Sequence, residues 1–497
     1  MIELQISKED FVYDIQAICK SFYPSETITQ TAWRNEKEGS LDADMVIKVE
    51  LLEESVLVTA GNGRAWLEQS GNASYQNRRK YKNILKKSLY SVLSELTGKQ
   101  LPWGTLSGVR PSKLVMELLE KGATKEEVDQ YMKEQYLCSQ EKIDLGYTIA
   151  KKEWNILKSI DYTKGYSLYI GIPFCPTKCS YCSFTSYPME RFGQWMEEYL
   201  QALFREMEYV ASKPWKRKLT SIYIGGGTPT TLSEEQLRRL LRKVKELFTM
   251  EHVVEFTVEA GRPDTITYEK LKVLKEEGAD RISINPQTMN QSTLDYIGRK
   301  HTVEEIENAF QMARKAGHQN INMDLIVGLP GEDEEAVKTT LNRIEQLNPE
   351  SLTVHSLVIK RAATLNENLE QEEERLTGDT KNMMMVAEKY AKTHGYEPYY
   401  MYRQKNATGM DQDSQENLGY AKPGKECIYN ILIMEEKQSI LALGAGASSK
   451  FLLPNGKKKI ERVENVKSVL DYIQRIEEMI NRKEQFLEIH KGELLRS

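Results

Sequence analysis

The sequence predicts an α/β protein built on a partial (β/α)6 barrel, with an α+β domain before the barrel and a smaller region after it. Two observations lead to this prediction. From about residue 166 to residue 358, short apolar or β-branched runs alternate with amphipathic helical patterns. Only six such units are present, which is fewer than the eight of a closed barrel. We therefore expect a parallel sheet that curves but stays open at the side.

Residues 1–160 predict the N-terminal α+β domain, whose role the sequence does not indicate. Residues 1–6 alternate like a short strand, and residues 45–59 alternate like two strands joined by an acidic turn. Helical periodicity occurs at 9–21, 77–96 and 125–136. The stretch 77–96 is basic and ends at Gly98. Its charges are typical of a solvated helix face, and a nucleic-acid contact is the alternative.

Residues 161–370 predict the barrel. Its six expected strands are Tyr166–Pro173, Ser221–Gly227, Glu255–Ala260, Arg281–Asn285, Asn320–Val327 and Ser351–Val358. Helical patterns lie between them, for example at 193–212 and 233–248. The second of these opens with Ser233 and has Gln236 three positions later, which is a capping box. Ligands of such barrels meet the carboxyl ends of the strands.

Residues 371–497 predict a smaller C-terminal region on the substrate side, because the βα alternation stops there. Helices are expected at 376–394 and 463–482. Between them lie a Tyr-rich segment, PYYMYRQKN at 398–406, and a Gly-rich segment, LGAGASSKF at 443–451.

Composition limits the class of protein. The chain is 40% hydrophobic and 28% charged, which is typical of an ordered globular protein. Its 68 basic and 73 acidic residues give a net charge of −5, which disfavours general nucleic-acid or membrane-surface binding. The sequence contains no apolar run of membrane-spanning length and does not start like a signal peptide. We therefore expect a cytoplasmic protein.

Three of the six cysteines, Cys175, Cys179 and Cys182, lie within eight positions, directly after the first expected barrel strand. A Cys-x3-Cys-x2-Cys loop suits three irons of a [4Fe–4S] cluster and leaves the fourth iron without a protein ligand. A structural zinc site is an alternative, but it needs a fourth ligand and the nearest histidine in the sequence is His252. A redox disulfide is the other alternative.

Polar and glycine residues follow the later strands. Gly225, Gly226 and Gly227 end the second strand, where missing side chains let a ligand approach the backbone. Four polar residues, Glu259, Gln287, Arg299 and Asp324, follow or end the next strands. Carboxylates and an amide bind ribose hydroxyls well, and an arginine pairs with a carboxylate through two hydrogen bonds.

The cysteine spacing after the first strand resembles that of the radical S-adenosylmethionine (radical SAM) enzymes. The resemblance implies that Cys175, Cys179 and Cys182 hold a [4Fe–4S] cluster whose open iron chelates SAM. In that superfamily an injected electron cleaves SAM to a 5′-deoxyadenosyl radical. The three glycines resemble the superfamily motif that binds the amino group of SAM.

Several motifs in chain order resemble the oxygen-independent coproporphyrinogen III oxidase (dehydrogenase) family, also called the HemN family. They are YxxIPFC, GGGTPT, Gln287-x11-Arg299 and DLIxGLPG, and they span about residues 166–335. The N-terminal extension, CSFTSYP and GAGASS resemble the HemZ-type branch. The resemblance implies SAM contacts at Tyr169, Gly226, Gly227, Thr228, Glu259, Gln287, Arg299 and Asp324.

The resemblance also implies an activity, the oxidative decarboxylation of two propionates of coproporphyrinogen III to vinyl groups, giving protoporphyrinogen IX in haem biosynthesis. A flavodoxin or ferredoxin is the implied electron donor. Two positions differ from the well-characterised enzymes, which have a cysteine at Phe184 and a histidine at Gly171. Phe184 occurs in relatives that act as haem chaperones, so a haem chaperone is the alternative. A radical SAM enzyme acting on another tetrapyrrole or on tRNA is a further one.

Four cations are candidates for binding the propionates, namely Lys360, Arg361, Arg403 and Lys405. They follow expected strand or loop ends near the Tyr-rich segment, and ordinary surface charges are the alternative. His355 lies inside the sixth strand, where we expect a structural histidine or, in a chaperone, a haem ligand.

Overall fold

The structure is a computed structural model of the chain, and it describes residues 1–34, 43–62, 65–108, 110–359, 363, 365, 378–404, 416–453 and 459–495. The chain forms two compact units, one of Met1–Lys151 with Tyr402–Gln415 and one of Lys152–Met401 with Glu416–Ser497. Among the described residues, no helix is long and apolar enough to cross a membrane.

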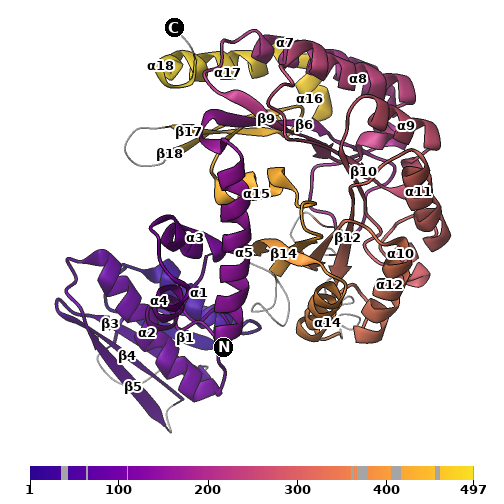
Figure 1. Cartoon of the computed structure of the whole chain (residues 1–497). Helices are drawn as coiled ribbons and strands as arrows, with labels where there is room; N and C mark the ends of the chain where they lie inside the picture. The colour runs from indigo at the N-terminus through magenta and orange to yellow at the C-terminus, as the bar shows by residue number, and fades with distance from the viewer. Residues whose placement is uncertain are drawn as a thin grey trace. The chain divides into compact units, whose positions relative to one another are not determined.

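The first unit is a five-stranded sheet covered by helices (Figure 1). The strand order is β2 (Ile28–Thr31), β1 (Ile2–Ile6), β3 (Met45–Leu51), β4 (Ser55–Gly61) and β5 (Trp66–Asn72). Strand β1 runs parallel to both neighbours, and β3 to β5 are antiparallel. Helices α1 (Val12–Phe22) and α2 (Arg78–Thr97) share an apolar core with the sheet. Helices α3 (Ser112–Glu120), α4 (Lys125–Tyr136) and α5 (Gln140–Ser159) follow.

The predicted elements of this unit are confirmed. The expected helix at 77–96 corresponds to α2, which ends at Gly98 in the left-handed conformation, with φ 67°. The expected helix at 125–136 is α4, which begins with a capping box between Thr124 and Glu127.

The second unit contains the predicted barrel. Its six parallel strands are β6 (Gly165–Ile172), β9 (Lys218–Gly226), β10 (Glu255–Gly261), β11 (Arg281–Ile284), β12 (Ile321–Val327) and β13 (Ser351–Ser356). They are neighbours in chain order, as repeated βα units require. Figure 1 shows the sheet curving, with helices along its outer face. These helices include α7 (Met196–Ala211), α8 (Glu234–Leu247), α9 (Tyr268–Glu276), α11 (Val303–Lys315) and α12 (Glu334–Leu347).

Strands from the C-terminal region extend the barrel sheet at both edges. Strand β15 (Glu416–Ala421) pairs antiparallel with β13, and β14 (Glu397–Arg403) lies beyond it. At the other edge β16 (Ser439–Leu443) runs parallel to β6, followed by β17 (Ser448–Leu453) and β18 (Lys459–Glu464). Residues far apart in the sequence thus form one 11-stranded sheet.

The predicted helix at 463–482 is partly wrong. Its first residues, Val463 and Glu464, belong to β18, residues 465–468 are not helical, and the helices are α16 (Val469–Gln474) and α17 (Ile476–Ile489). Strand β18 pairs antiparallel with the preceding strand β17, from Leu453 opposite Lys459 to Ser448 opposite Glu464. This pairing overrides the helical propensity of the Glu- and Arg-containing sequence. The other expected helix, at 376–394, corresponds to α14 (Thr380–Thr393).

A buried ion pair joins the C-terminal helices to the barrel. Lys483 of α17 and Glu206 of α7 are 1% and 0% exposed and lie 2.6 Å apart, Nζ to Oε1. Glu206 also accepts hydrogen bonds from Tyr472 Oη, Asn465 Nδ2 and the Gly444 N–H. Every charge is therefore matched, which a buried pair requires.

Replacing one partner of this pair should destabilise the second unit. Because Lys483→Met leaves Glu206 charged and buried without its cation, we expect the free energy of unfolding to fall by about 3–5 kcal/mol. Urea denaturation followed by circular dichroism measures this. The control is Lys491→Met, since Lys491 forms an exposed pair with Glu488 that is worth about 0–1 kcal/mol. Equal stability of the two variants would contradict the assignment.

Candidate cluster and cofactor site

The cysteine loop is closed at its base by two short paired strands. Strand β7 (Phe174–Cys175) pairs with β8 (Tyr187–Pro188), so the loop that carries Cys179 and Cys182 leaves and returns at one place. The Tyr187 N–H donates to the Pro173 carbonyl over 2.8 Å. Within the loop, the Cys182 N–H donates to the Cys179 carbonyl over 3.1 Å. This closure holds the three thiols at the carboxyl end of β6.

The glycine triplet seats the end of β9 directly against the start of this loop. The Gly227 N–H donates to the Ile172 carbonyl over 2.8 Å, and the Thr228 N–H donates to the Phe174 carbonyl over 2.7 Å. A Cβ atom at Gly227 would lie 2.6 Å from the Phe174 oxygen, closer than side chains allow. Gly226 has φ 108°, which an L side chain rarely adopts. A glycine is therefore required at both positions.

Two buried cations surround Cys179. Arg262 is 3% exposed, and its Nη1 lies 3.7 Å from Cys179 Sγ. Asp264 holds its Nη2 at 2.6 Å. The Arg299 guanidinium also adjoins Cys179, together with Tyr181. These cations would balance the negative charge of thiolate ligands.

Arg262 is a site residue that the sequence analysis did not identify. It directly follows β10, in the segment EAGRPDT, so its position after a strand end was the available signal.

Without a bound metal, burial disfavours the ionised form of the cysteine thiols. It raises the pKa of Cys175 to about 11, an effect that the neighbouring thiols increase, and it also raises the pKa of Cys182. Metal binding removes these protons, so a cluster and protons compete for the same sulfurs.

The donor set fits a cluster better than a single ion. In the described part of the chain, no three His, Cys, Asp or Glu side chains are placed to share one metal ion. A structural zinc site needs four ligands at one point, whereas each cysteine of a cluster binds its own iron. The loop with three thiols and two adjacent arginines therefore suits the cluster.

A buried carboxylate lies beside the glycine triplet. Tyr223 Oη donates to Glu259 Oε1 over 2.5 Å, and a Cβ atom at Gly225 would lie 2.8 Å from the Glu259 carboxyl. Burial raises the pKa of Glu259 to about 7, and the charge of Asp324 adds to this increase. Tyr169 stacks near Tyr223, with ring centroids 6.3 Å apart. The missing side chain of Gly225 therefore leaves room for Glu259.

Gln287 occupies a strained backbone position between β11 and β12. Its φ of 70° lies in the left-handed region, and its N–H donates to the Asp324 carbonyl over 2.9 Å. Its own carbonyl accepts from the Ile326 N–H at 2.9 Å. Strain held by two backbone hydrogen bonds is typical of residues that a functional site positions.

Asp324 lies at the centre of β12, not at its end as the strand-end pattern implied. Its Oδ1 accepts a hydrogen bond from Asn322 Nδ2 at 2.7 Å.

Arg299 presents an unused donor. It is 5% exposed, and its Nη1 donates to the Asn285 carbonyl. Its Nε is buried and has no hydrogen-bond partner. A buried guanidinium N–H without a partner is costly unless an anion binds to it. The observation therefore fits the carboxylate-binding role expected for Arg299.

The remaining candidates have different surroundings. Arg403 belongs to the first unit, where its Nη1 donates to the Leu106 carbonyl over 2.7 Å. Lys360, Arg361 and Lys405 lie outside the described residues. Burial lowers the pKa of His355, which has hydrogen-bonding contact with Asn417 and lies near Asp324.

Two aromatic residues of the cysteine loop region differ in exposure. Phe174 is buried and packs edge-on against Tyr199, with ring centroids 5.3 Å apart. Phe184 is 71% exposed. Of these two residues, only Phe174 packs in the core.

Comparison with known proteins gives consistent matches. The sequence profile of the radical SAM superfamily matches residues 169–344. The chain is 42% identical over 411 residues to the oxygen-independent coproporphyrinogen-III oxidase-like protein HemZ of Bacillus subtilis, covering 82% of this chain and 81% of that protein. It is 36% identical over 282 residues to the haem chaperone HemW of Bacillus subtilis, covering 56% of this chain and 70% of that protein.

A solved structure has the same fold. The coproporphyrinogen III oxidase HemN of Escherichia coli matches with a TM-score of 0.51 and 24% identity, covering 66% of this chain and 73% of that one. This match confirms the predicted fold class.

Alanine at each cysteine of the loop should abolish cluster binding. We expect Cys175→Ala, Cys179→Ala and Cys182→Ala to fold but to lose iron, sulfide and brown colour after anaerobic reconstitution, because each removes one iron ligand. The matched control is Cys138→Ala, a buried cysteine whose thiol donates to the Trp103 carbonyl. A full iron and sulfide content in any loop variant would overturn the ligand assignment.

The titration of Glu259 should appear in SAM binding. The carboxylate accepts hydrogen bonds from ribose hydroxyls better than the neutral acid does, so affinity should fall as the pH drops through about 7. Tyr223→Phe removes a hydrogen bond that stabilises the carboxylate, and the midpoint should therefore move to higher pH. Calorimetric titration of SAM at several pH values tests this, with Tyr390→Phe as control. A flat profile in the unsubstituted protein would contradict it.

Proposed function

This chain belongs to the HemZ-type family of oxygen-independent coproporphyrinogen-III oxidase-like proteins, within the radical SAM superfamily, and we propose that it is an anaerobic coproporphyrinogen III dehydrogenase. As a member of that superfamily it uses a [4Fe–4S] cluster and S-adenosylmethionine. The observation that carries the proposal is the similarity to the coproporphyrinogen oxidase-like relative over most of both chains. The polar site beside the cysteine loop supports it.

The proposed reaction converts two propionate side chains of coproporphyrinogen III to vinyl groups. When bound, the cluster and SAM supply a 5′-deoxyadenosyl radical, which is reduced to 5′-deoxyadenosine as it takes a hydrogen atom. Each propionate loses one β-hydrogen atom, carbon dioxide and one electron. The electron passes to a one-electron acceptor, and a flavodoxin or ferredoxin is the proposed donor for SAM cleavage.

The chain's own residues have positioning and electrostatic roles in this proposal. Cys175, Cys179 and Cys182 are the proposed cluster ligands, and Arg262 balances their charge. Arg299 is proposed to bind the SAM carboxylate through its unpaired Nε. The glycine triplet exposes backbone groups to SAM at Gly226 and Gly227, next to Thr228.

Polar groups along the barrel are proposed to hold the rest of SAM. Glu259 on β10, Gln287 just after β11 and Asp324 on β12 are proposed to bind the ribose hydroxyls, and Tyr169 lies within β6. A radical reaction gains from holding the two reacting groups close together.

The amino end of the barrel is closed by the short helix α15 (Ile428–Glu435). Glu255 at the start of β10 accepts hydrogen bonds from the Ile428 N–H at 2.7 Å and the Tyr429 N–H at 3.1 Å. The Tyr429 ring stacks on Tyr223, with centroids 4.6 Å apart. We propose that this packing limits access of water from that end, which would suppress side reactions of a radical.

A product assay tests the proposed activity. Anaerobically reconstituted protein with dithionite or a reduced flavodoxin, SAM and coproporphyrinogen III should yield 5′-deoxyadenosine, methionine, carbon dioxide and protoporphyrinogen IX. Cys179→Ala should yield none of them, and Cys138→Ala should match the unsubstituted protein. Cluster-loaded protein that cleaves SAM but forms no vinyl product would refute this substrate.

A haem chaperone is the second candidate function, and two observations favour it. Phe184 stands where the well-characterised enzymes have a fourth cysteine, and its ring is exposed. The chain also resembles HemW over 56% of its length. Haem uptake at one molecule per chain, without turnover in the product assay, would support this function over the enzyme.

A further inference from the structure

The segment after β10 places Arg262 against the cysteine loop. Arg262 follows Gly261, whose φ of 69° turns the chain at the end of the strand, and it precedes the short helical turn η4 (Pro263–Thr265). Two hydrogen bonds fix its backbone. Its N–H donates to the Ala260 carbonyl over 2.9 Å, and its carbonyl accepts from the Thr265 N–H over 3.1 Å. The end of β10 therefore determines where the Arg262 side chain starts.

One nitrogen of Arg262 contacts the loop between its first two cysteines. Nη1 donates to the Thr177 carbonyl over 3.0 Å and to Thr177 Oγ1 over 2.8 Å, and it lies 3.7 Å from Cys179 Sγ. Thr177 Oγ1 in turn donates to the Gly298 carbonyl over 3.2 Å. Because Thr177 lies between Cys175 and Cys179, one charged donor both braces the loop and reaches the sulfur of a proposed cluster ligand.

Asp264 sets the orientation of the guanidinium. Its Oδ1 accepts a hydrogen bond from Arg262 Nε over 3.0 Å, and its Oδ2 accepts one from Nη2 over 2.6 Å. This two-point pairing fixes the plane of the guanidinium. The carboxylate binds Nε and Nη2, whereas the third nitrogen, Nη1, is the one near Cys179. The pair therefore turns its positive end towards the sulfur.

The charge of Asp264 is balanced by Arg262 and not by His301. The His301 side chain is fully buried, and its Nδ1 lies 3.9 Å from Asp264 Oδ1, which is too far for a hydrogen bond. Burial, together with the charges of Arg299 and Arg262, lowers the pKa of His301 to about 4, so its ring is neutral at neutral pH. Among the described residues, Arg262 is therefore the only charged cation paired with Asp264.

A positive donor beside a cluster sulfur favours the reduced form of the cluster. Reduction adds one negative charge, and hydrogen bonds to the sulfurs and the local net charge are among the features that set the potential of an iron–sulfur cluster. Arg262 is 3% exposed, so water screens its charge little. Loss of this charge should therefore make reduction of the cluster harder.

We propose that Arg262, oriented by Asp264, is a positioning residue of the cysteine loop and raises the reduction potential of the cluster bound there. This role rests on the cluster ligands assigned in the proposed function, but not on coproporphyrinogen III as the substrate. It deepens that function, because SAM cleavage begins when an electron enters the cluster. Arg262 makes this electron transfer more favourable.

Redox titration of the cluster, followed by electron paramagnetic resonance, tests the electrostatic role. The full chain is reconstituted anaerobically with iron and sulfide, and the midpoint potential is measured without SAM. Arg262→Met removes both the charge and the donor, so we expect its midpoint potential to shift to a more negative value. Arg262→Lys keeps the charge but loses the planar two-point pairing with Asp264, and it should shift the potential less.

The bracing role has a separate readout, the rate of iron release to a chelator. This rate should rise by about threefold or more in Arg262→Met and in Thr177→Val, since each variant loses a hydrogen bond of the loop. Thr177→Val leaves the charge of Arg262 in place. Its midpoint potential should therefore stay close to that of the unsubstituted protein.

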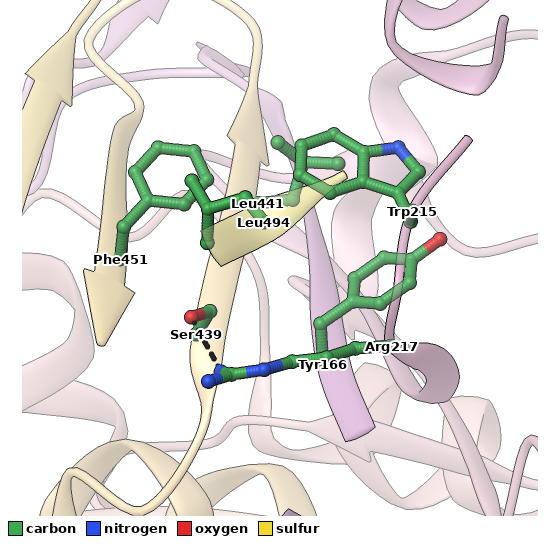
Figure 2. Close-up of a pocket in the computed structure, with 7 residues that line it drawn as sticks. All are labelled: Tyr166, Trp215, Arg217, Ser439, Leu441, Phe451 and Leu494. Carbon is green, nitrogen blue, oxygen red and sulfur yellow. Dashed lines mark hydrogen bonds between the residues drawn. The ribbon is translucent and has the colours of Figure 1, made fainter. Parts of the chain in front are cut away.

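The matched control is Arg217→Met. Arg217 is half-buried, and its Nη1 donates to Ser439 Oγ over 2.9 Å, as Figure 2 shows. It directly precedes β9, whose first residue pairs with the first residue of β6. Because the cysteine loop follows the other end of β6, Arg217 lies about 20 Å from it. Its loss should leave both the midpoint potential and the rate of iron release unchanged.

The outcomes separate this role from the proposed reaction. A midpoint potential of Arg262→Met that equals or exceeds that of the unsubstituted protein, or an equal shift in Arg217→Met, would overturn the proposal. If Arg262→Met retains no cluster, Arg262→Lys decides: a more negative potential supports the proposal, and an equal or higher one overturns it. A shifted potential without any vinyl product would refute only the proposed substrate.

Discussion

The backbone contact between the ends of β6 and β9 is the constraint on which the site depends. Two hydrogen bonds, from Gly227 to Ile172 and from Thr228 to Phe174, join the second strand to the segment that leads into the cysteine loop. They form only because Gly227 lacks a Cβ atom that would collide with the Phe174 carbonyl. The same contact places Thr228 Oγ1 3.5 Å from Cys175 Sγ. The cluster ligands and the glycine motif are thus one structural element.

Two opposing electrostatic effects act on the ionisable groups around this element. Burial opposes ionisation of Cys175 and Glu259, whereas Arg262 and Arg299 bring positive charge to the thiols. Shifted pKa values of this kind are common where ligands bind. The buried Nε of Arg299 shows the same principle, because its cost is offset only when an anion is bound.

The two ends of the barrel hold different groups. The cysteine loop and the glycine triplet lie at the carboxyl ends of β6 and β9, where ligands meet barrels of this type. At the amino ends, Glu255 of β10 accepts hydrogen bonds from the first N–H groups of α15. The C-terminal strands β16 and β17 contribute to both ends: the turn after β16 is held by Glu206 near Gly171, and Ser439 of β16 binds Arg217.

The sequence by itself determined the six parallel strands, the place of the cysteine loop and part of the N-terminal unit, because each depends on local periodicity, caps and spacing; it did not predict β2, β5, α3 or α5. It did not reveal that residues 459–464 form a strand, since their Glu, Arg and Lys residues favour a helix and only pairing with β17 makes them extended. The sequence also did not indicate the roles of Arg262 and Tyr223. Arg262 lies beside the thiol of Cys179, and Tyr223 donates a hydrogen bond to the carboxyl group of Glu259. Only folding determines those distances.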